Sequence, residues 1–314
     1  MAAQTELSAN RSGMARVIAF MNQKGGVGKT TTTVNLAAAF ARAGRPTLVV
    51  DLDPQAHASL HLGVDTSNVE RSVYDVLIDP NADVDAAIHR TRENLHVLPA
   101  QTDLAGAETE LALSSDPNRQ RRLEHALARL QNRYEFVLID CPPSLGQLTI
   151  NGLVAAREVI MPMQAHFLAL HGVSKLLETV SLVTQSLNPR LRVAGVVLCM
   201  HEAQSTHTKE VVSDLEQFFD QQRENDVPWR FARVLRPVIR RNIKLAECPS
   251  FGQTIFEYAP TAPGAEDYST LAGALLQAWD AMLAKRSTAQ VETKPASSTP
   301  AHEGHPEPNV GVSA

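Results

Sequence analysis

The sequence lacks the features that would place the protein in a membrane or outside the cell. No stretch approaches the ~18 consecutive apolar residues of a membrane-spanning helix. Residues 1–13 are polar and lack the apolar core of a secretory signal peptide. Only three cysteines occur, Cys141, Cys199 and Cys248, and their spacing fits no metal site. We therefore expect a soluble cytoplasmic protein whose cysteines are small buried residues in a reducing compartment.

An excess of positive charge is also absent. The 29 lysines and arginines are outnumbered by 34 aspartates and glutamates, which gives a formal net charge of −5. Any contact with nucleic acid must therefore be local, because the whole chain is not a polycation. Its 314 residues, 44% hydrophobic and 20% charged, are typical of a soluble protein with a substantial core, in one large α/β domain or two small ones.

A glycine-rich stretch is the strongest feature that the sequence does have. Residues 23–31 read QKGGVGKTT and lie between a strand-like run, residues 17–21, and a helix-like run, residues 31–43. Successive backbone N–H groups of such a loop can surround an anion, and the helix N-terminus adds its positive dipole end. Lys29 is expected to reach the β- and γ-phosphates, and the Thr30 hydroxyl to bind Mg²⁺. The alternative is a polar turn with incidental glycines. The predicted phosphate-binding residues are Lys24, Gly25, Gly26, Val27, Gly28, Lys29, Thr30 and Thr31.

Three aspartates follow apolar, strand-like runs. Asp51 and Asp53 come at or after the end of residues 47–51, and Asp140 ends residues 136–140. In an open α/β sheet, a carboxylate at the C-terminal end of a strand lies at the ligand-binding edge. Asp140 is therefore predicted to bind the same Mg²⁺ as Thr30. For Asp51 and Asp53, capping of the next helix is the alternative.

Strand-like and helix-like runs alternate along the chain, which predicts right-handed βαβ units and a mostly parallel sheet. The stretch KGGVGKTT, residues 24–31, resembles the deviant Walker A motif of the ParA/MinD ATPases. Residues 22–26 and 51–55 are similar to the chromosomal ParA (Soj) type. The resemblance, which covers residues 16–284, implies the α/β fold of P-loop NTPases, with a mostly parallel sheet flanked by helices in three layers. Position 23 departs from the usual phosphate loop, because it is glutamine instead of glycine.

The same resemblance implies an activity, its cofactors and its catalytic residues. The protein is expected to hydrolyse ATP with Mg²⁺ in a dimer that forms face to face when ATP binds. Lys24 would reach the phosphates held by the partner subunit, Lys29 those of its own subunit, and Asp53 would orient the attacking water.

A run without acidic residues lies near the C-terminal end. Residues 227–246 contain six cations and no acid, and residues 240–252 resemble a family segment that lies near adenine and contributes to non-specific DNA binding. Arg240 replaces a proline of that segment, and Cys248 an alanine. The alternative is a solvated positive surface without a ligand. The residues expected near adenine are Asn242 and Pro249, and those expected to contact DNA are Arg233, Arg236, Arg240, Arg241 and Lys244.

We therefore expect a disordered leader over residues 1–15, an ATPase domain over residues 16–286 and a disordered tail, rich in proline, serine and alanine, over residues 287–314. The tail has almost no large apolar residues, so we expect no membrane binding. The predicted function is an ATP-dependent DNA-partitioning switch on the nucleoid, stimulated by a ParB-like adaptor. Positioning of another protein cargo is the alternative. An iron–sulfur reductase would need differently spaced cysteines, and no substrate motif supports a metabolic ligase.

Overall fold

The structure is a computed structural model, which describes residues 15–130, 132–165, 169–202 and 206–292. The chain divides into two compact units, Met1–Leu276 and Gln277–Ala314. The first unit holds one sheet with the strand order β3-β4-β2-β5-β1-β6-β7-β8. Every described pair of neighbouring strands is parallel except β3 and β4, which confirms the predicted mostly parallel sheet. The strands are β1 Arg16–Phe20, β2 Thr47–Asp51, β3 His89–Arg92, β4 Leu95–Leu98, β5 Phe136–Asp140, β6 Glu158–Met163, β7 Arg192–Leu198 and β8 Arg233–Leu235.

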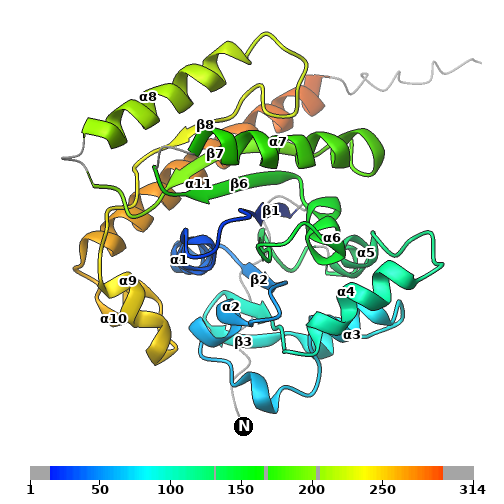
Figure 1. Ribbon diagram of the computed structural model, residues 1–314. Helices are drawn as coiled ribbons and strands as arrows, with labels where there is room; N and C mark the ends of the chain where they lie inside the picture. Colours follow the sequence, from blue (N-terminus) through cyan, green and yellow to red (C-terminus); the bar gives the residue numbers. More distant parts are fainter. Residues whose placement is uncertain (1–14, 131, 166–168, 203–205, 293–314) are drawn as a thin grey trace, which may run out of the picture. The chain divides into compact units, whose positions relative to one another are not determined.

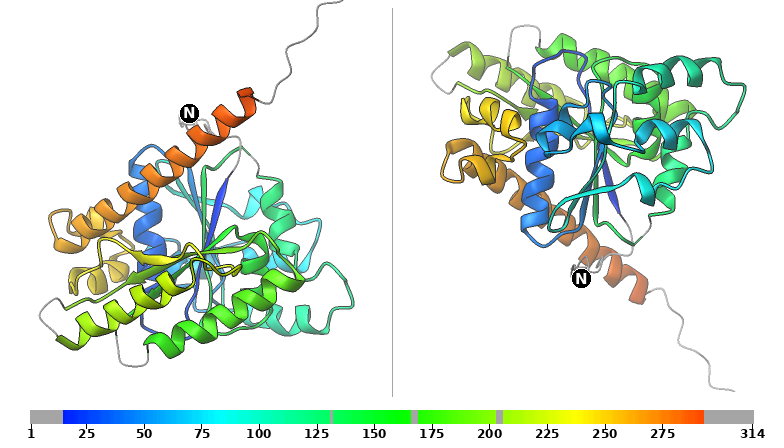
Figure 2. Two further views of the ribbon diagram at one scale, coloured as in Figure 1. Left: turned by 90° about the horizontal axis from the view of Figure 1, so that it is seen from above. Right: turned by 90° about the horizontal axis from the view of Figure 1, so that it is seen from below.

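Helices cover both faces of this sheet and complete the three layers of an α/β fold (Figures 1 and 2). α1 lies on one face, beside the part of α11 that ends at Leu276, because the hydroxyls of Thr32 and Tyr268 are 3.0 Å apart. α5 to α8 lie on the other face. The helices are α1 Lys29–Arg42, α2 His57–His61, α3 Val73–Ile78, α4 Leu104–Leu113, α5 Arg122–Ala128, α6 Gln147–Ala155, α7 Ala169–Ser186, α8 Thr206–Gln221, α9 Lys244–Glu247, α10 Ile255–Tyr258 and α11 Pro263–Glu292, with short 3-10 turns η1 Thr66–Asn68, η2 Asp85–Ala87 and η3 Cys248–Phe251.

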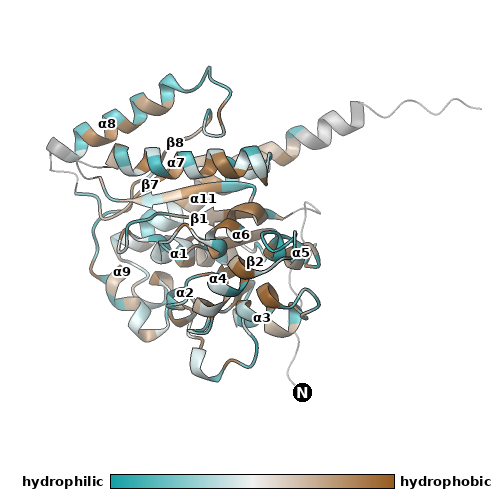
Figure 3. Cartoon of the chain, turned by 45° about the vertical axis from the view of Figure 1, so that its right-hand side comes forward, coloured by the Kyte–Doolittle hydropathy of each residue, from teal (hydrophilic) through white to brown (hydrophobic). Residues whose placement is uncertain are grey.

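The core consists mainly of aliphatic side chains, from the strands of the sheet and from the helices that cover them. All five residues of β2 and all five of β5 are buried, as expected for parallel strands that are covered on both faces. α7 and α8 are one-sided instead: Figure 3 shows polar and apolar residues alternating around both. On α7 the buried residues recur at helical spacing, from Val173 through Leu176, Leu177 and Val180 to Val183. All three cysteines are free and buried, as predicted.

Some predicted elements differ from the structure. Leu123, Leu127 and Leu130 recur at helical spacing and predict a helix over residues 119–130, but α5 starts only at Arg122. The same pattern predicts a solvated face that carries Arg121, Arg122 and Arg129, and for Arg122 this is wrong. Its guanidinium, 11% exposed, pairs with Asp116 at 2.6 Å. β3 and β8 were not predicted; each has four residues or fewer, too few for a clear periodicity.

The predicted ends of the chain are tested only in part. α11 continues to Glu292, past residue 286, where the predicted domain ended. The rest of the predicted tail and residues 1–14 of the predicted leader lie outside the described residues. Within the described residues, no helix has both the length and the hydropathy needed to span a bilayer.

Candidate functional site

The glycine-rich loop joins β1 to α1 at the C-terminal edge of the sheet. Gly28 is the N-cap of α1 and has φ +94°, a conformation that L-residues rarely adopt. Its Cα also packs against the residue that follows β7, since a Cβ added there would come within 3.2 Å of the Cys199 sulfur. By contrast, a Cβ added at Gly25 or Gly26 would meet nothing within 4 Å. The backbone of this loop is therefore open on one side and supported on the other, as an anion cradle requires.

Thr30 and Asp140, the two predicted magnesium ligands, are in direct contact. The Thr30 hydroxyl donates a hydrogen bond of 2.7 Å to Asp140 Oδ2, and the Thr33 hydroxyl donates one of 3.1 Å to Oδ1. Asp140 is fully buried at the end of β5. Burial, followed by the negative charge of Asp51, raises the pKa of Asp140 to about 7. A hydroxyl and a buried carboxylate with a raised pKa fit a hard divalent cation, which would favour the ionised form of the acid.

Asp51 and Asp53 lie in different surroundings, although Asp51 ends β2 and Asp53 comes only two residues later. Asp51 is fully buried; its carboxylate accepts hydrogen bonds of 2.8 Å from the Ser59 backbone N–H and from the Ser59 hydroxyl. Burial raises its pKa to about 6. For Asp51 the structure therefore supports the alternative, in which the acid stabilises the helix that follows. Asp53 is half-buried and accepts a hydrogen bond from the Gln55 N–H, at 3.0 Å.

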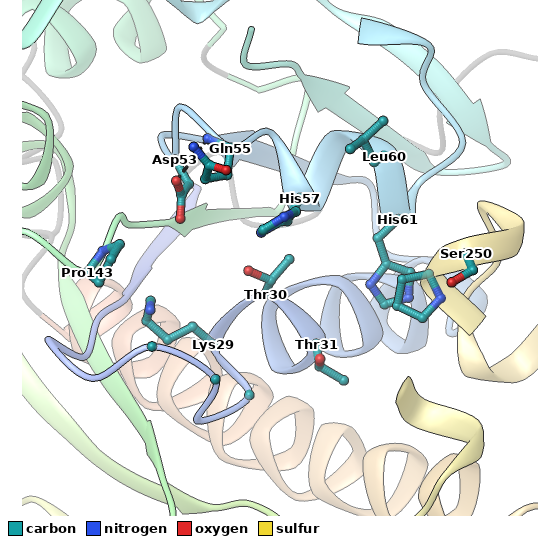
Figure 4. Close-up of a pocket in the computed structure, with 14 residues that line it drawn as sticks. Lys29, Thr30, Thr31, Asp53, Gln55, His57, Leu60, His61, Pro143 and Ser250 are labelled. Carbon is teal, nitrogen blue, oxygen red and sulfur yellow. Dashed lines mark hydrogen bonds between the residues drawn. The ribbon is translucent and has the colours of Figure 1, made fainter. Parts of the chain in front are cut away.

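The loop, Asp53 and two later segments surround one cavity of about 590 Å³. Figure 4 shows Lys29, Asp53 and Pro143 at one end of this cavity, and Thr31, His61 and Ser250 at the other. We name the two ends after the ligand groups expected there. The phosphate end carries the lysine of the phosphate loop, and the nucleoside end carries Ser250, which belongs to the segment expected near adenine, residues 240–252. The cavity is lined by Gly25, Gly26, Gly28, Lys29, Thr30, Thr31, Asp53, Gln55, His57, Leu60, His61, Pro143, Pro249 and Ser250.

The two residues expected near adenine border different cavities. Pro249 lines the first cavity, whereas Asn242 lines a neighbouring one of about 330 Å³. Both cavities are also lined by Gly28 and Thr31, so they adjoin at the start of α1. The side-chain nitrogen of Asn242 is buried without a hydrogen-bond partner among the described residues. A buried donor left unpaired is costly, which favours a ligand acceptor at this position.

The two lysines of the loop are placed differently. The Lys29 side chain is buried, with the residue 8% exposed, at the phosphate end. Lys24 is exposed, and among the described residues it is not part of the cavity lining. Its backbone N–H donates to the side chain of Asn22, which in turn donates to the Pro162 carbonyl. The loop therefore holds the base of Lys24 in place and leaves its side chain free to contact a group outside the subunit.

Residues 227–246, which we call the basic run, contain no acid, but other segments of the folded chain bring carboxylates next to them. Arg240 makes hydrogen bonds to buried Asp267 and a 2.8 Å ion pair with Glu266. Arg241 pairs with Glu202 at 2.8 Å. The remaining predicted DNA contacts are Lys244, paired with Glu247 at 2.8 Å, Arg236, paired with Glu216 at 2.7 Å, and Arg233, which is exposed and has no ion pair among the described residues.

Comparisons with known proteins assign the chain to a family. Residues 15–193 match a family described as an AAA domain. The sporulation initiation inhibitor protein Soj of Bacillus subtilis is 44% identical over 82% of this chain and 97% of its own length. The chain belongs to the ParA/MinD family of P-loop ATPases. This confirms the predicted family and fold, and the Soj relative falls in the ParA (Soj) branch that the sequence resembles.

Two further relatives of this ParA/MinD-type ATPase agree with that assignment. The chromosome partitioning protein ParA of Myxococcus xanthus is 41% identical over 84% of this chain and 89% of its own length. A crystal structure described as cobyrinic acid a,c-diamide synthase from Mycobacterium smegmatis, with bound ADP and magnesium, is 39% identical. It has a TM-score of 0.70 and covers 85% of this chain and 96% of its own.

The sequence did not identify part of the cavity lining. His57, Leu60 and His61 of α2 line the cavity, as does Ser250 of η3. His61 is 1% exposed, and its Nε2 lies 3.5 Å from the sulfur of Cys248. The residues of α2 could have been predicted to line the cavity, because they closely follow a carboxylate at the ligand-binding edge of the sheet. Nothing in the sequence indicates that Cys248 faces His61.

Proposed function

We propose that this protein is a ParA-type partition ATPase that binds ATP with Mg²⁺, dimerises on ATP and holds DNA without sequence preference until an adaptor protein stimulates hydrolysis. The observation that carries this proposal is the phosphate end of the cavity. There, buried Lys29, the Thr30–Asp140 pair and half-buried Asp53 face one space, while Lys24 stands exposed outside it. The Soj and ParA relatives support the partition role.

The residues of the phosphate end divide the work of phosphoryl transfer. Loop N–H groups and Lys29 would bind the phosphates, with Lys29 neutralising charge that develops on them. Thr30 and Asp140 would hold Mg²⁺, which neutralises the β- and γ-phosphates when bound. Asp53 would accept a hydrogen bond from the attacking water and orient it, because its carboxylate is otherwise engaged only with Gln55 among the described residues.

Dimerisation would complete the site. In one subunit Lys29 already serves the phosphates, whereas the side chain of Lys24 is exposed outside the cavity. A second lysine placed this way suits the nucleotide of a facing subunit, where it would add a cation at the transferred phosphate. Hydrolysis would remove the γ-phosphate to which Lys24 binds and so release the dimer.

DNA binding would use the exposed members of the basic run. Arg241 and Lys244 form ion pairs in which the cationic side chains are 75% and 45% exposed. Such surface pairs contribute about 1 kcal/mol or less, so DNA phosphates can replace the carboxylates. Arg233 and Arg236 are also exposed and would add to the patch. Arg240 is held by a buried aspartate and would mainly support the segment. This surface would place the protein on the nucleoid in the cytoplasm.

An amide-forming ligase is a weaker candidate. One solved relative is described as a diamide synthase, and an enzyme that takes nitrogen from glutamine through a cysteine needs a reactive thiolate. All three cysteines here are buried, and burial raises the pKa of each thiol, to about 11 for Cys199 and for Cys248.

Positioning of a protein cargo on the nucleoid uses the same ATPase cycle and differs only in the adaptor.

The test is DNA binding by wild type and Arg241→Ala, with ATP and Mg²⁺, titrated from low to moderate salt. Four phosphate contacts in a dimer predict a log–log salt slope of about −3.6, and Arg241→Ala should flatten it by about 1.8. Arg223→Ala is the matched control, because Arg223 is also an exposed arginine in an ion pair, with Asp220, but lies outside the basic run. An unchanged slope in Arg241→Ala would place the DNA site elsewhere, and no DNA binding by wild type would refute the nucleoid-based function.

A further inference from the structure

The nucleoside end of the cavity has a wall made from two segments that are distant in sequence. Leu60 and His61 come from α2, and Pro249 and Ser250 from η3. The backbones of the two segments touch just behind this wall. A Cβ added at Gly252, which has φ +61°, would come within 2.9 Å of the Cα of Gly63. The shape of this end therefore depends on how the two segments are held together.

One side chain on a third segment holds both. Arg92, on the edge strand β3, donates from Nη1 to the Leu62 carbonyl at 2.7 Å and from Nη2 to the Gly252 carbonyl at 2.8 Å. Its Nε donates to Glu257 of α10 at 2.8 Å. The side chain is 22% exposed and is not part of the cavity lining. A planar guanidinium thus fixes the end of α2 and the end of η3 at one distance from each other.

The carboxylate that orients Arg92 is itself fixed. Glu257 accepts hydrogen bonds from the backbone N–H of Thr254, at 2.8 Å, and from its hydroxyl, at 3.0 Å, as part of a capping box at the start of α10. Arg92 and Glu257 therefore form a rigid bracket behind the wall. Lysine in place of Arg92 keeps the charge but cannot donate in three fixed directions in one plane.

We propose that Arg92 is a positioning residue that sets the affinity of the protein for nucleotide by fixing the wall at the nucleoside end, without contacting the nucleotide. This inference rests on the proposed binding of ATP. Among the described residues, Lys29 and Asp53 make no hydrogen bond to Arg92, and Figure 4 shows both at the other end of the cavity. Loss of the bracket should therefore weaken binding of the nucleoside portion and leave the phosphate chemistry intact.

The experiment compares Arg92→Lys with wild type and with Arg90→Lys, an exposed arginine two residues earlier on β3. We measure the Kd for ADP, the inhibition constant of inorganic tripolyphosphate with Mg²⁺, and KM and kcat for ATP. In Arg92→Lys the Kd for ADP and the KM should rise about tenfold or more, as misplaced binding groups commonly cause. The kcat and the inhibition constant of tripolyphosphate should stay within about threefold of wild type, and Arg90→Lys should match wild type throughout.

A second variant tests the bracket as a unit. Glu257→Gln keeps an oxygen for the capping box but weakens the bond to Arg92, so it should raise the KM less than Arg92→Lys does, and the double variant should be no worse than Arg92→Lys alone. An unchanged Kd for ADP in Arg92→Lys overturns the proposal, as does an equal loss of ADP and tripolyphosphate. Wild-type protein that binds neither ATP nor ADP would instead refute the proposed function. Thermal unfolding of each variant without nucleotide shows that it is folded.

Discussion

His61 gives the wall of the cavity a defined response to acid. The imidazole is 1% exposed, on the last residue of α2, and its Nε2 lies 3.5 Å from the Cys248 sulfur. Burial and then the positive charge of Arg92 lower its pKa from 6.5 to about 4. In the folded protein His61 is therefore neutral at physiological pH. In the unfolded chain it returns to its ordinary pKa and becomes protonated at mildly acidic pH.

The direction and size of the effect on stability follow from this difference. A base whose pKa is lowered by folding contributes stability above the unfolded value of 6.5, and this is lost as the pH falls from 6.5 to 4. The whole shift corresponds to about 3 kcal/mol, at 1.36 kcal/mol per pKa unit. Linkage over the narrower interval from pH 7 to pH 5 gives a loss of about 2 kcal/mol in the free energy of unfolding.

The assay is urea unfolding of wild type and His61→Gln at pH 7, 6 and 5. Other groups titrate here too: the raised pKa values of Asp51 and Asp140 make folding more favourable as the pH falls, opposite in sign to His61. They are common to both proteins and cancel in the difference. Wild type should therefore lose about 2 kcal/mol relative to His61→Gln between pH 7 and pH 5.

His57→Gln is the control, because His57 is exposed on the same helix and lines the same cavity. This comparison shows whether the pH dependence belongs to the buried imidazole of His61 or is shared by an exposed histidine of the same helix. If the free energies of unfolding of wild type and His61→Gln differ by the same amount at every pH, the assigned effect of His61 is refuted. Equal changes with pH for His57→Gln and His61→Gln would also refute it. NMR titration of the His61 imidazole gives a second measurement, which does not depend on the stability of the variant.

Two further predictions concern the phosphate end. Lys29→Ala should reduce nucleotide affinity or turnover about 100-fold or more, because it removes a buried cation from the phosphates. Calorimetry with ADP measures the affinity, and a phosphate-release assay measures the turnover. Wild-type values in both would contradict the phosphate-loop assignment. Asp53→Ala should slow hydrolysis and accumulate the ATP-bound dimer, because the attacking water loses its orienting carboxylate; light scattering that finds this variant monomeric with ATP at micromolar concentration, where wild type dimerises, would contradict the sandwich mechanism.

The residues that the sequence assigns to the phosphate end lie close together in the structure, because most of them are local in sequence. Gly28, Lys29 and Thr30 are adjacent in one loop, and the position of Asp140 follows from the rule that parallel strands deliver their C-terminal ends to one edge. The different surroundings of Asp51 and Asp53 were not predictable. Asp51 is taken out of the site by Ser59, eight residues later, and that contact exists only once α2 has folded back over β2.

The basic run shows a different limit of sequence reasoning. Residues 227–246 contain no acid, but most of the acids that pair with them come from other segments: Glu202 follows β7, Glu216 lies on α8, and Asp267 lies on α11. Only Glu247, the partner of Lys244, is a neighbour in sequence. A charge pattern along the chain does not include neighbours that arrive through the fold. β8, the edge strand that carries Arg233, is likewise recognisable only by its pairing with β7.

The two ends of the cavity are thus built by different means, and this determines what a substitution does at each. At the phosphate end, one loop and the ends of two strands, β2 and β5, carry the groups that would bind and react, so losing one group would remove chemistry. At the nucleoside end, Gly63 and Gly252 bring two backbones together, Arg92 bonds to both, and His61 packs against Cys248. None of these contacts involves a group that is expected to react with the nucleotide. Changes there should shift affinity continuously while the reaction continues, so relatives can differ in nucleotide affinity at these positions and keep one phosphate loop.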